Sequence, residues 1–319
     1  MNLVEELRNN EYIKERAFGN ISSFNFTRDA FEGSVWNDQT IVSRGLYINT
    51  VTNKIVARGF NKFFNIGERE ETQLENLKTM KFPVTCYVKE NGYLGLVSYN
   101  EETDDLFVTT KSDPTGDYSK WLTQMICVSM NVTRLRKMKE FCRDNDVTLV
   151  FEFVYPTKDP HIIEYKDAEL FLLSIIKNDI KFTQYSYDEI VSLANDLGIT
   201  CKKKAYVLNS YNEFVTWYNT VTAKGWTYEG KNIEGFVIED SEGYMVKVKL
   251  YYYKFWKYMR SIAQGTLTKG FYKREDLIED EDAKEFYEFL KKLYLTTTEE
   301  ERLKLTDNII ALRNKFYES

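Results

Sequence analysis

The order of apolar and polar residues divides this chain of 319 residues at about residue 250. Before that point, short alternating or wholly apolar runs predict strands, because side chains in extended backbone alternate between two faces. The predicted strands are residues 84–88, 94–99, 106–110, 148–154, 170–175, 235–239 and 244–250. Apolar residues at helical spacing between them predict helices at 117–130, 132–142, 187–197 and 211–222.

After residue 250 the strand pattern disappears. Residues 282–293 and 298–316 are predicted to form amphipathic helices, and Thr298 with Glu301 can form a capping box at the start of the second. We therefore predict an α+β domain over residues 1–250 and a small all-α domain over residues 251–319.

The composition indicates an ordinary globular protein. It is 43% apolar and 15% aromatic, which is enough for one large core and a small second domain. No apolar run approaches the roughly 20 residues of a membrane span, and the first residues lack the pattern of a secretion signal. We expect no membrane association and a cytoplasmic location. The four cysteines lack metal-binding spacing, and the single histidine, His161, excludes a multi-histidine zinc site.

The basic residues are concentrated in one segment, although the net charge is −6. From residue 247 to residue 274 there are eight basic residues and no acidic ones: Lys247, Lys249, Lys254, Lys257, Arg260, Lys269, Lys273 and Arg274. Such a basic surface can bind phosphates, and the aromatic residues between them can stack on bases. Alternatively, the aromatic residues pack the helices and the basic residues form a solvated face.

Lys89 is a candidate nucleophile. It ends the apolar alternation of Val84, Cys86 and Val88, and Gly92 follows where a turn could bring the backbone close to a nucleotide. A neutral lysine amine can form a covalent intermediate that divides a difficult transfer into easier steps. Alone, this Lys-x-x-Gly sequence is far more often a surface lysine before a turn, because chance matches are common.

Lys247 and Lys249 are predicted to share one face of a strand. At about 3.3 Å per residue they lie roughly 7 Å apart, while Val246, Val248 and Leu250 face the core. Two neighbouring lysines suit a triphosphate, and their charge would lower the pKa of an attacking lysine. The alternative is a solvated face on an edge strand.

Glu152 and Glu234 are candidate carboxylates for a nucleotide or metal. Glu152 lies in a run so apolar that both faces are expected to be buried, so its carboxylate needs a partner. Glu234 enters a buried strand from a loop. A ribose hydroxyl or a hydrated Mg²⁺ could be the partner of Glu152, because Mg²⁺ takes one or two carboxylates together with substrate phosphates. A structural ion pair explains Glu152 equally well.

In order along the chain, these motifs resemble those of the ATP-dependent RNA ligases of the T-even phage type and of the adenylyltransferase module of fungal tRNA ligases. The resemblance covers about residues 43–249 and includes Arg44-Gly45 and Lys62-Phe63-Phe64-Asn65. It implies a nucleotidyltransferase domain, of the ATP-grasp-like ligase kind, with antiparallel sheets flanked by helices. It also implies a lysyl-AMP intermediate on Lys89.

The resemblance also implies roles for the other residues. Arg44 and Lys62 are implied contacts to nucleotide or RNA phosphates, and Lys111 is a weaker match of the same kind. Glu152 and Glu234 are implied contacts to the AMP ribose and the metal, and Lys247 and Lys249 to the ATP phosphates. We therefore assign Lys89, Glu234, Lys247 and Lys249 as catalytic. The nucleotide-binding set adds Arg44, Lys62, Asn91, Gly92, Lys111 and Glu152.

The implied function is an ATP-dependent RNA ligase for RNA repair that joins 5′-phosphate and 3′-hydroxyl ends. ATP and Mg²⁺, with Mn²⁺ possible, are the implied cofactors, and RNA, possibly nicked tRNA, is the partner. RNA is expected to contact the basic residues from Lys254 to Arg274. We expect a monomer, in the host cytoplasm if a phage encodes it.

Three alternatives remain open. A DNA ligase or a capping guanylyltransferase of the same superfamily usually carries an appended β-barrel, which the helical pattern after residue 250 opposes. A non-catalytic RNA-binding protein is opposed by the complete set of lysines and glutamates. Asn91 stands where many DNA ligases and several RNA ligases carry Asp, so this position does not decide the substrate.

Overall fold

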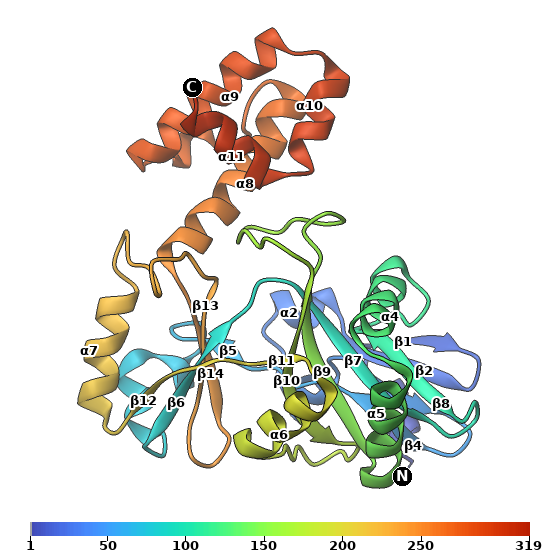
Figure 1. Cartoon of the computed structure of the whole chain (residues 1–319). Helices are drawn as coiled ribbons and strands as arrows, with labels where there is room; N and C mark the ends of the chain where they lie inside the picture. The colour runs from blue at the N-terminus through green and yellow to red at the C-terminus, as the bar shows by residue number, and fades with distance from the viewer. Residues whose placement is uncertain (1) are drawn as a thin grey trace. The chain divides into compact units, whose positions relative to one another are not determined.

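The computed structural model describes residues 2–319, which group into two compact units (Figure 1). Unit 1 contains the chain up to Phe64, Gly92–Val154 and Ala168–Lys203, and unit 2 contains Asn65–Asn91, Tyr155–Asp167 and Lys204–Ser319. This grouping joins residues 251–319 to the sheet before them, and the predicted domain division at residue 250 stays a prediction. None of the helices described within residues 2–319 combines the length and hydropathy of a membrane-spanning segment.

Unit 1 contains two sheets. The first has the order β1-β2-β3-β4 and is antiparallel, with β1 (Ile13–Phe18), β2 (Ile21–Phe26), β3 (Leu46–Asn49) and β4 (Lys54–Arg58). The second has the order β11-β10-β9-β7-β8, with β7 (Tyr93–Asn100), β8 (Asp105–Thr110), β9 (Val147–Val154), β10 (Glu169–Lys177) and β11 (Thr200–Cys201). Every residue of β9 is buried, which confirms the prediction for residues 148–154.

The helices of unit 1 are α1 (Leu3–Arg8), α2 (Arg28–Glu32), α3 (Asp38–Val42), α4 (Asp117–Ser129), α5 (Val132–Asn145) and α6 (Tyr187–Leu197). Both α4 and α5 contact β7, and α5 also contacts β9. Helix α6 begins at a capping box of Ser186 and Glu189 and ends at Gly198, whose φ of +66° is left-handed. These helices confirm the predictions for residues 117–130, 132–142 and 187–197.

Unit 2 is built on a sheet of order β12-β6-β13-β14-β5 (Figure 1). Its strands are β5 (Phe64–Asn65), β6 (Val84–Lys89), β12 (Lys204–Leu208), β13 (Gly235–Glu239) and β14 (Met245–Lys249). The 3₁₀ turns η1 (Glu70–Thr72) and η2 (Leu74–Thr79) follow β5, and α7 (Tyr211–Val221) follows β12. Val88, Phe236 and Val248 share a core with Phe214 and Trp217 of α7. Because strand residues alternate, Lys89, Lys247 and Lys249 lie on the other face.

The rest of unit 2 is helical. It comprises α8 (Tyr251–Lys269), the 3₁₀ turn η3 (Glu275–Leu277), α9 (Glu281–Thr296), α10 (Glu299–Thr306) and α11 (Ile309–Tyr317). Figure 1 shows α8 leading from β14 to the last three helices. Trp256, Phe286 and Leu312 form their core with Ile162 and Ile163 from the segment Tyr155–Asp167.

One predicted helix was wrong in its extent. Residues 298–316 form two helices, because Asn308 begins α11 and its Oδ1 accepts a hydrogen bond from the Ala311 backbone at 3.0 Å. Asparagine is a preferred residue at helix starts, so it competes with continuation of α10. The capping box of Thr298 and Glu301 at the start of α10 is confirmed.

Candidate active site

Glu234 is the centre of a charged cluster in unit 2. Its side chain is only 3% exposed. Its carboxylate lies 3.1 Å from Lys89 Nζ and 3.0 Å from Lys249 Nζ, and it accepts a hydrogen bond from Asn91 Nδ2 at 2.8 Å. Burial raises the pKa of Glu234. Lys89 and Lys249 together lower this pKa by more than burial raises it, so it lies below its ordinary value. An ionised carboxylate therefore holds both lysines.

The sheet of unit 2 brings these residues together. In the register of the sheet, Gly235 of β13 pairs with Lys89 of β6 on one side and with Lys249 of β14 on the other. Gly235 has to be glycine, since a Cβ there would lie 1.9 Å from the carbonyl oxygen of Val248. Glu234 thus precedes a residue that both neighbouring strands approach closely, which explains the Glu-Gly pair in the sequence.

Asn91 uses both ends of its side-chain amide. While Nδ2 donates to Glu234, Oδ1 accepts hydrogen bonds from the backbone N–H groups of Ile162 and Ile163, each at 3.1 Å. The Asn91 backbone N–H also donates to the Tyr165 hydroxyl at 2.7 Å, and this hydroxyl donates to Glu90 at 2.8 Å. An ionised Asp at this position could not donate to Glu234.

Two aromatic residues belong to this cluster that sequence reasoning did not place there. Tyr165 contacts Glu90 and Asn91 as described above. The ring centroid of Tyr253, in the first turn of α8, lies 4.6 Å from Lys249 Nζ. We considered Tyr253 only as a packing or base-stacking residue, although its four-residue separation from Lys249 across the β14–α8 junction could have suggested the contact.

Lys257 and His161 lie in the electrostatic field of the same cluster. Burial lowers the pKa of Lys257, and Lys249 lowers it further, while Glu234 opposes both effects. Burial also lowers the pKa of His161, on which Arg260, Glu234 and Lys89 act as well. Lys247 shares the β14 face of Lys249, as predicted, and β14 is an interior strand because β5 pairs beyond it.

In unit 1, Glu152 lies beside Gly92. The residue is 9% exposed, and Oε1 accepts a hydrogen bond from the Gly92 backbone N–H at 2.9 Å. A Cβ at residue 92 would lie 2.2 Å from the carbonyl oxygen of Phe153, so glycine is required by strand β9. The sequence pattern suggested that this glycine lets a nucleotide approach the backbone, and the close approach of β9 is a second reason for it.

Arg44 and Lys111 accompany Glu152. Burial lowers the pKa of Arg44 and the charge of Glu152 opposes this effect. The pKa of Lys111 is lowered by burial and then by Arg44. Gly45 has a φ of +73°, a conformation that residues other than glycine rarely adopt, which accounts for the glycine of the Arg-Gly pair.

Lys62 faces aromatic rings. Its ammonium lies 3.8 Å from the ring centroid of Phe64, 5.1 Å from that of Trp36 and 5.9 Å from that of Phe31. A cation over aromatic faces is attracted by their quadrupoles. These rings fix the position of Lys62, and its predicted contact with a phosphate stays a prediction.

The predicted metal ligands are two separate carboxylates, those of Glu152 and Glu234. Within residues 2–319, no three His, Cys, Asp or Glu side chains gather as a metal-binding group. Mg²⁺ commonly keeps several waters and takes one or two carboxylates with substrate phosphates. Both carboxylate oxygens of Glu234 are paired with lysines, so its role as a metal ligand stays a prediction.

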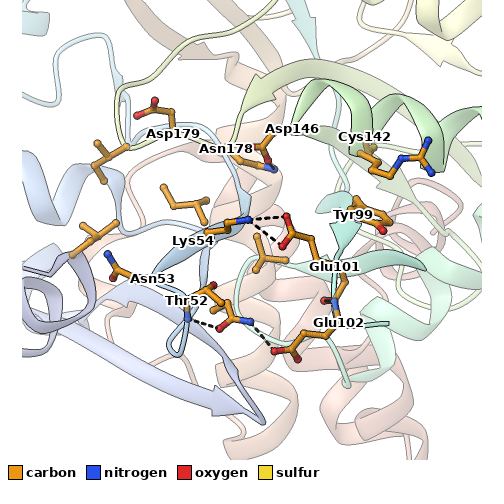
Figure 2. A pocket seen from close by; sticks show the side chains of 17 residues that line it. Thr52, Asn53, Lys54, Tyr99, Glu101, Glu102, Cys142, Asp146, Asn178 and Asp179 are labelled. Atoms are coloured by element: carbon orange, nitrogen blue, oxygen red, sulfur yellow. Dashed lines mark hydrogen bonds and ion pairs between the residues drawn. The ribbon is translucent and has the colours of Figure 1, made fainter. Parts of the chain in front are cut away.

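A separate cavity of about 590 Å³ lies in unit 1 (Figure 2). Figure 2 shows Lys54 bonded to Glu101, a contact of 3.0 Å. Asn49 Nδ2 donates a hydrogen bond to Glu102 at 2.8 Å. None of the predicted site residues, all of which lie in the described part of the chain, lines this cavity.

Comparison with known proteins agrees with this geometry. A sequence profile of the family described as RNA ligase matches residues 42–257, more than half of the chain. The chain belongs to the RNA ligase family. This RNA ligase family member is 27% identical to a tRNA ligase of Candida albicans over 268 residues, which are 72% of the chain and 31% of that protein. It is 26% identical to tRNA ligase 1 of Schizosaccharomyces pombe over 214 residues, which are 61% of the chain and 26% of that protein.

The chain thus spans about a third or less of the length of these fungal relatives. Among solved structures, an archaeal ATP-dependent RNA ligase resembles this RNA ligase family member with a TM-score of 0.55 and 14% identity. That similarity covers 99% of this chain and 78% of the other, and at such identity it shows a shared fold. The predicted family and the predicted α+β fold of antiparallel sheets and helices are confirmed.

Proposed function

We propose that this protein is an ATP-dependent RNA ligase that joins 5′-phosphate and 3′-hydroxyl RNA ends. The observation that supports the proposal most is the position of Glu234 between Lys89 and Lys249, in a chain that belongs to the RNA ligase family. The cluster offers one amine as a nucleophile, further cations for phosphates and one buried carboxylate that orients them.

In the first step, Lys89 Nζ attacks the α-phosphorus of ATP. The amine must lose its proton before it attacks, and the new N–P bond forms as the bond to pyrophosphate breaks. Lys247 and Lys249 offset the negative charge that the leaving pyrophosphate carries away. Glu234 holds Lys89 and Lys249 in one orientation, which lowers the cost of alignment.

In the second step, an oxygen of the RNA 5′-phosphate attacks the lysyl-AMP, so that the N–P bond breaks and a phosphoanhydride forms. In the third step, the 3′-hydroxyl attacks the same 5′-phosphate and AMP leaves. Mg²⁺ or Mn²⁺, when bound, would offset charge on the crowded phosphates. Glu234 and Glu152 are the proposed carboxylates for it.

The residues of unit 1 are proposed to contact the substrates. Arg44 and Lys111 combine partial burial with positive charge, which suits a phosphate, and Glu152 suits a ribose hydroxyl. We propose that Lys62 binds a phosphate while the aromatic rings around it hold its ammonium in place.

The proposed RNA-binding residues are more exposed than the aromatic residues Tyr253 and Trp256 that lie among them. Lys254, Lys257, Lys269, Lys273 and Arg274 are exposed, and Arg260 is half-buried. Tyr253 and Trp256 are buried in the helical core, so packing explains much of the aromatic content. We propose that the basic residues bind RNA, nicked tRNA in particular, and that the protein works as a monomer in the cytoplasm.

The test begins with ATP labelled at the α-phosphate. The parent protein and Lys78→Ala, which changes an exposed lysine of η2, should both form a covalent adduct, and Lys89→Ala should not. The labelled protein is then given nicked RNA, nicked DNA and tRNA anticodon loops with and without a 2′-phosphate. Sealing of RNA supports the proposal. Preferential sealing of DNA, or labelling from GTP in place of ATP, would favour the other members of the superfamily.

A further inference from the structure

Arg313 of α11 is a buried cation. Its side chain is 5% exposed, Nη1 donates to the carbonyl oxygen of Ile162 at 3.1 Å, and Nη2 donates to Glu164 at 3.2 Å. The guanidinium lies 5.5 Å from the ring centroid of Tyr252 and 5.7 Å from that of Trp256. A buried charge requires such partners, so Arg313 is held in one place against the segment around Ile162.

The same segment is bonded to Asn91. The N–H groups of Ile162 and Ile163 both donate to Asn91 Oδ1, and Asn91 Nδ2 donates to Glu234. The two peptide groups that flank Ile162 thus connect the last helix with the carboxylate between Lys89 and Lys249. All of these residues belong to unit 2.

We infer that Arg313 is a positioning residue for the transfer of AMP to Lys89, and that it acts through Ile162 and Asn91. This inference rests on the proposed function. The two N–H donors decide which end of the Asn91 amide faces Glu234, because the reversed amide would turn an oxygen toward the carboxylate. Arg313 fixes those donors by binding the carbonyl of Ile162. Without Arg313, Asn91 and Glu234 lose their fixed orientation.

The first experiment measures single-turnover labelling at saturating ATP. Arg313→Met should label about 10- to 100-fold more slowly with little change in apparent ATP affinity, because a misplacement of about 1 Å can cost 100-fold. Arg313→Lys should recover part of the rate. Glu164→Gln should have little effect, since the Glu164 side chain is 64% exposed and its bond to Arg313 is screened.

The matched control is Arg302→Met. Arg302 donates to the carbonyl oxygens of Tyr294 and Thr297 and stacks on Tyr294, so it links α10 to the end of α9 in the same helical part of unit 2. Arg302→Met should lower thermal stability and leave the labelling rate per folded molecule unchanged. An equal loss of rate in both arginine variants would reduce Arg313 to a structural role and overturn the inference.

A double-mutant cycle tests the route. In an Asn91→Ala background, which already lacks the bond to Glu234, Arg313→Met should slow labelling much less than it does in the parent. Equal slowing in both backgrounds would contradict action through Asn91.

Hydrogen exchange provides a measurement that does not need activity. The amides of Ile162 and Ile163 should exchange faster in Arg313→Met than in the parent or in Arg302→Met. Unchanged exchange would overturn the inference whatever the enzyme does. A parent protein that takes no label from ATP would instead contradict the proposed function.

Discussion

The two buried glutamates, Glu234 and Glu152, differ in what surrounds them. Glu234 is bonded to the side chains of Lys89, Asn91 and Lys249, whereas Glu152 accepts a hydrogen bond from the backbone N–H of Gly92 and acts electrostatically on Arg44. The first carboxylate orients charged groups, and the second fixes the path of the chain. Asn91 and Gly92 are consecutive, so one short motif supplies a partner to each carboxylate.

The largest expected effect comes from removing the nucleophile beside Glu234. Lys89→Ala should abolish covalent labelling, since the amine that forms the N–P bond is gone. Lys89→Arg keeps the positive charge next to Glu234 and should also remain unlabelled, with thermal stability close to that of the parent. The measurement is intact mass after incubation with ATP, and an AMP adduct on either variant would contradict the assignment.

Glu234→Ala should have the next largest effect. Glu234→Ala removes the carboxylate that orients Lys89 and Lys249. Losing one oriented group that stabilises developing charge, here Lys249, commonly costs about 2.7–4 kcal/mol of barrier, or about 100- to 1,000-fold in rate. The labelling rate should fall by this amount, and Lys247→Ala should also lose more activity than stability. Labelling rates and thermal unfolding are measured on the same preparations. If rate and stability fell together, both residues would be structural.

Glu152→Gln should have a smaller effect. Glutamine keeps an acceptor for the Gly92 N–H and loses the charge that acts on Arg44. We expect labelling to slow about tenfold, because a hydrogen bond to a charged group contributes roughly 1.5–3 kcal/mol and one to a neutral group roughly 0.5–1.5 kcal/mol. Glu234→Gln serves as the comparison and should slow labelling much more, because both lysines lose an ionised partner. Similar losses in the two variants would remove the distinction between the carboxylates.

The ionised carboxylate of Glu234 also predicts that the stability of the folded protein depends on pH. The pKa of Glu234 lies below its ordinary value of 4.5, so its ionised form stabilises the folded state. This contribution is complete above the unfolded pKa and is lost as the pH falls through the folded pKa. In denaturant unfolding, the free energy of unfolding should therefore be higher for the parent than for Glu234→Gln near neutral pH, and this difference should narrow in acid. A difference in the free energy of unfolding that widens in acid would mean that folding raises the pKa of Glu234.

Much of the fold around Glu234 was predictable from local patterns. The alternation of β6 and β14 predicted which residues are buried, and Val88, Val246 and Val248 are indeed in the core. The pairing of Glu234 with Lys89 was not predictable, because it depends on the register of β13 between two strands distant in sequence. The residues bonded to Asn91 come from a further segment, which no motif indicated.

Two other regions show why pattern alone is insufficient. The first strand, β1, contains no buried residue and carries little apolar alternation, so residues 13–18 gave no clear signal. Helix α8 begins with Tyr251, Tyr252 and Tyr253, residues that favour strands intrinsically. Packing of Trp256 and Met259 in the helical core decides its structure, as tertiary contacts often override propensity.

The smallest expected effect on labelling belongs to the basic residues farthest along the chain from Lys249. Lys269→Ala, Lys273→Ala and Arg274→Ala, combined in one protein, should leave formation of the Lys89 adduct nearly intact. These three side chains are exposed, and the side chains bonded to Glu234 are those of Lys89, Asn91 and Lys249. RNA binding should weaken with a shallower dependence on salt, because fewer counterions are released. Sealing should fail at the RNA-dependent steps.

The control is Lys284→Ala with Lys304→Ala, which removes exposed lysines that already pair with Glu281 and Glu300. If the triple variant sealed nicked RNA as well as this control at about 150 mM salt, where charges are screened beyond about 8 Å, the basic residues would be only a solvated face.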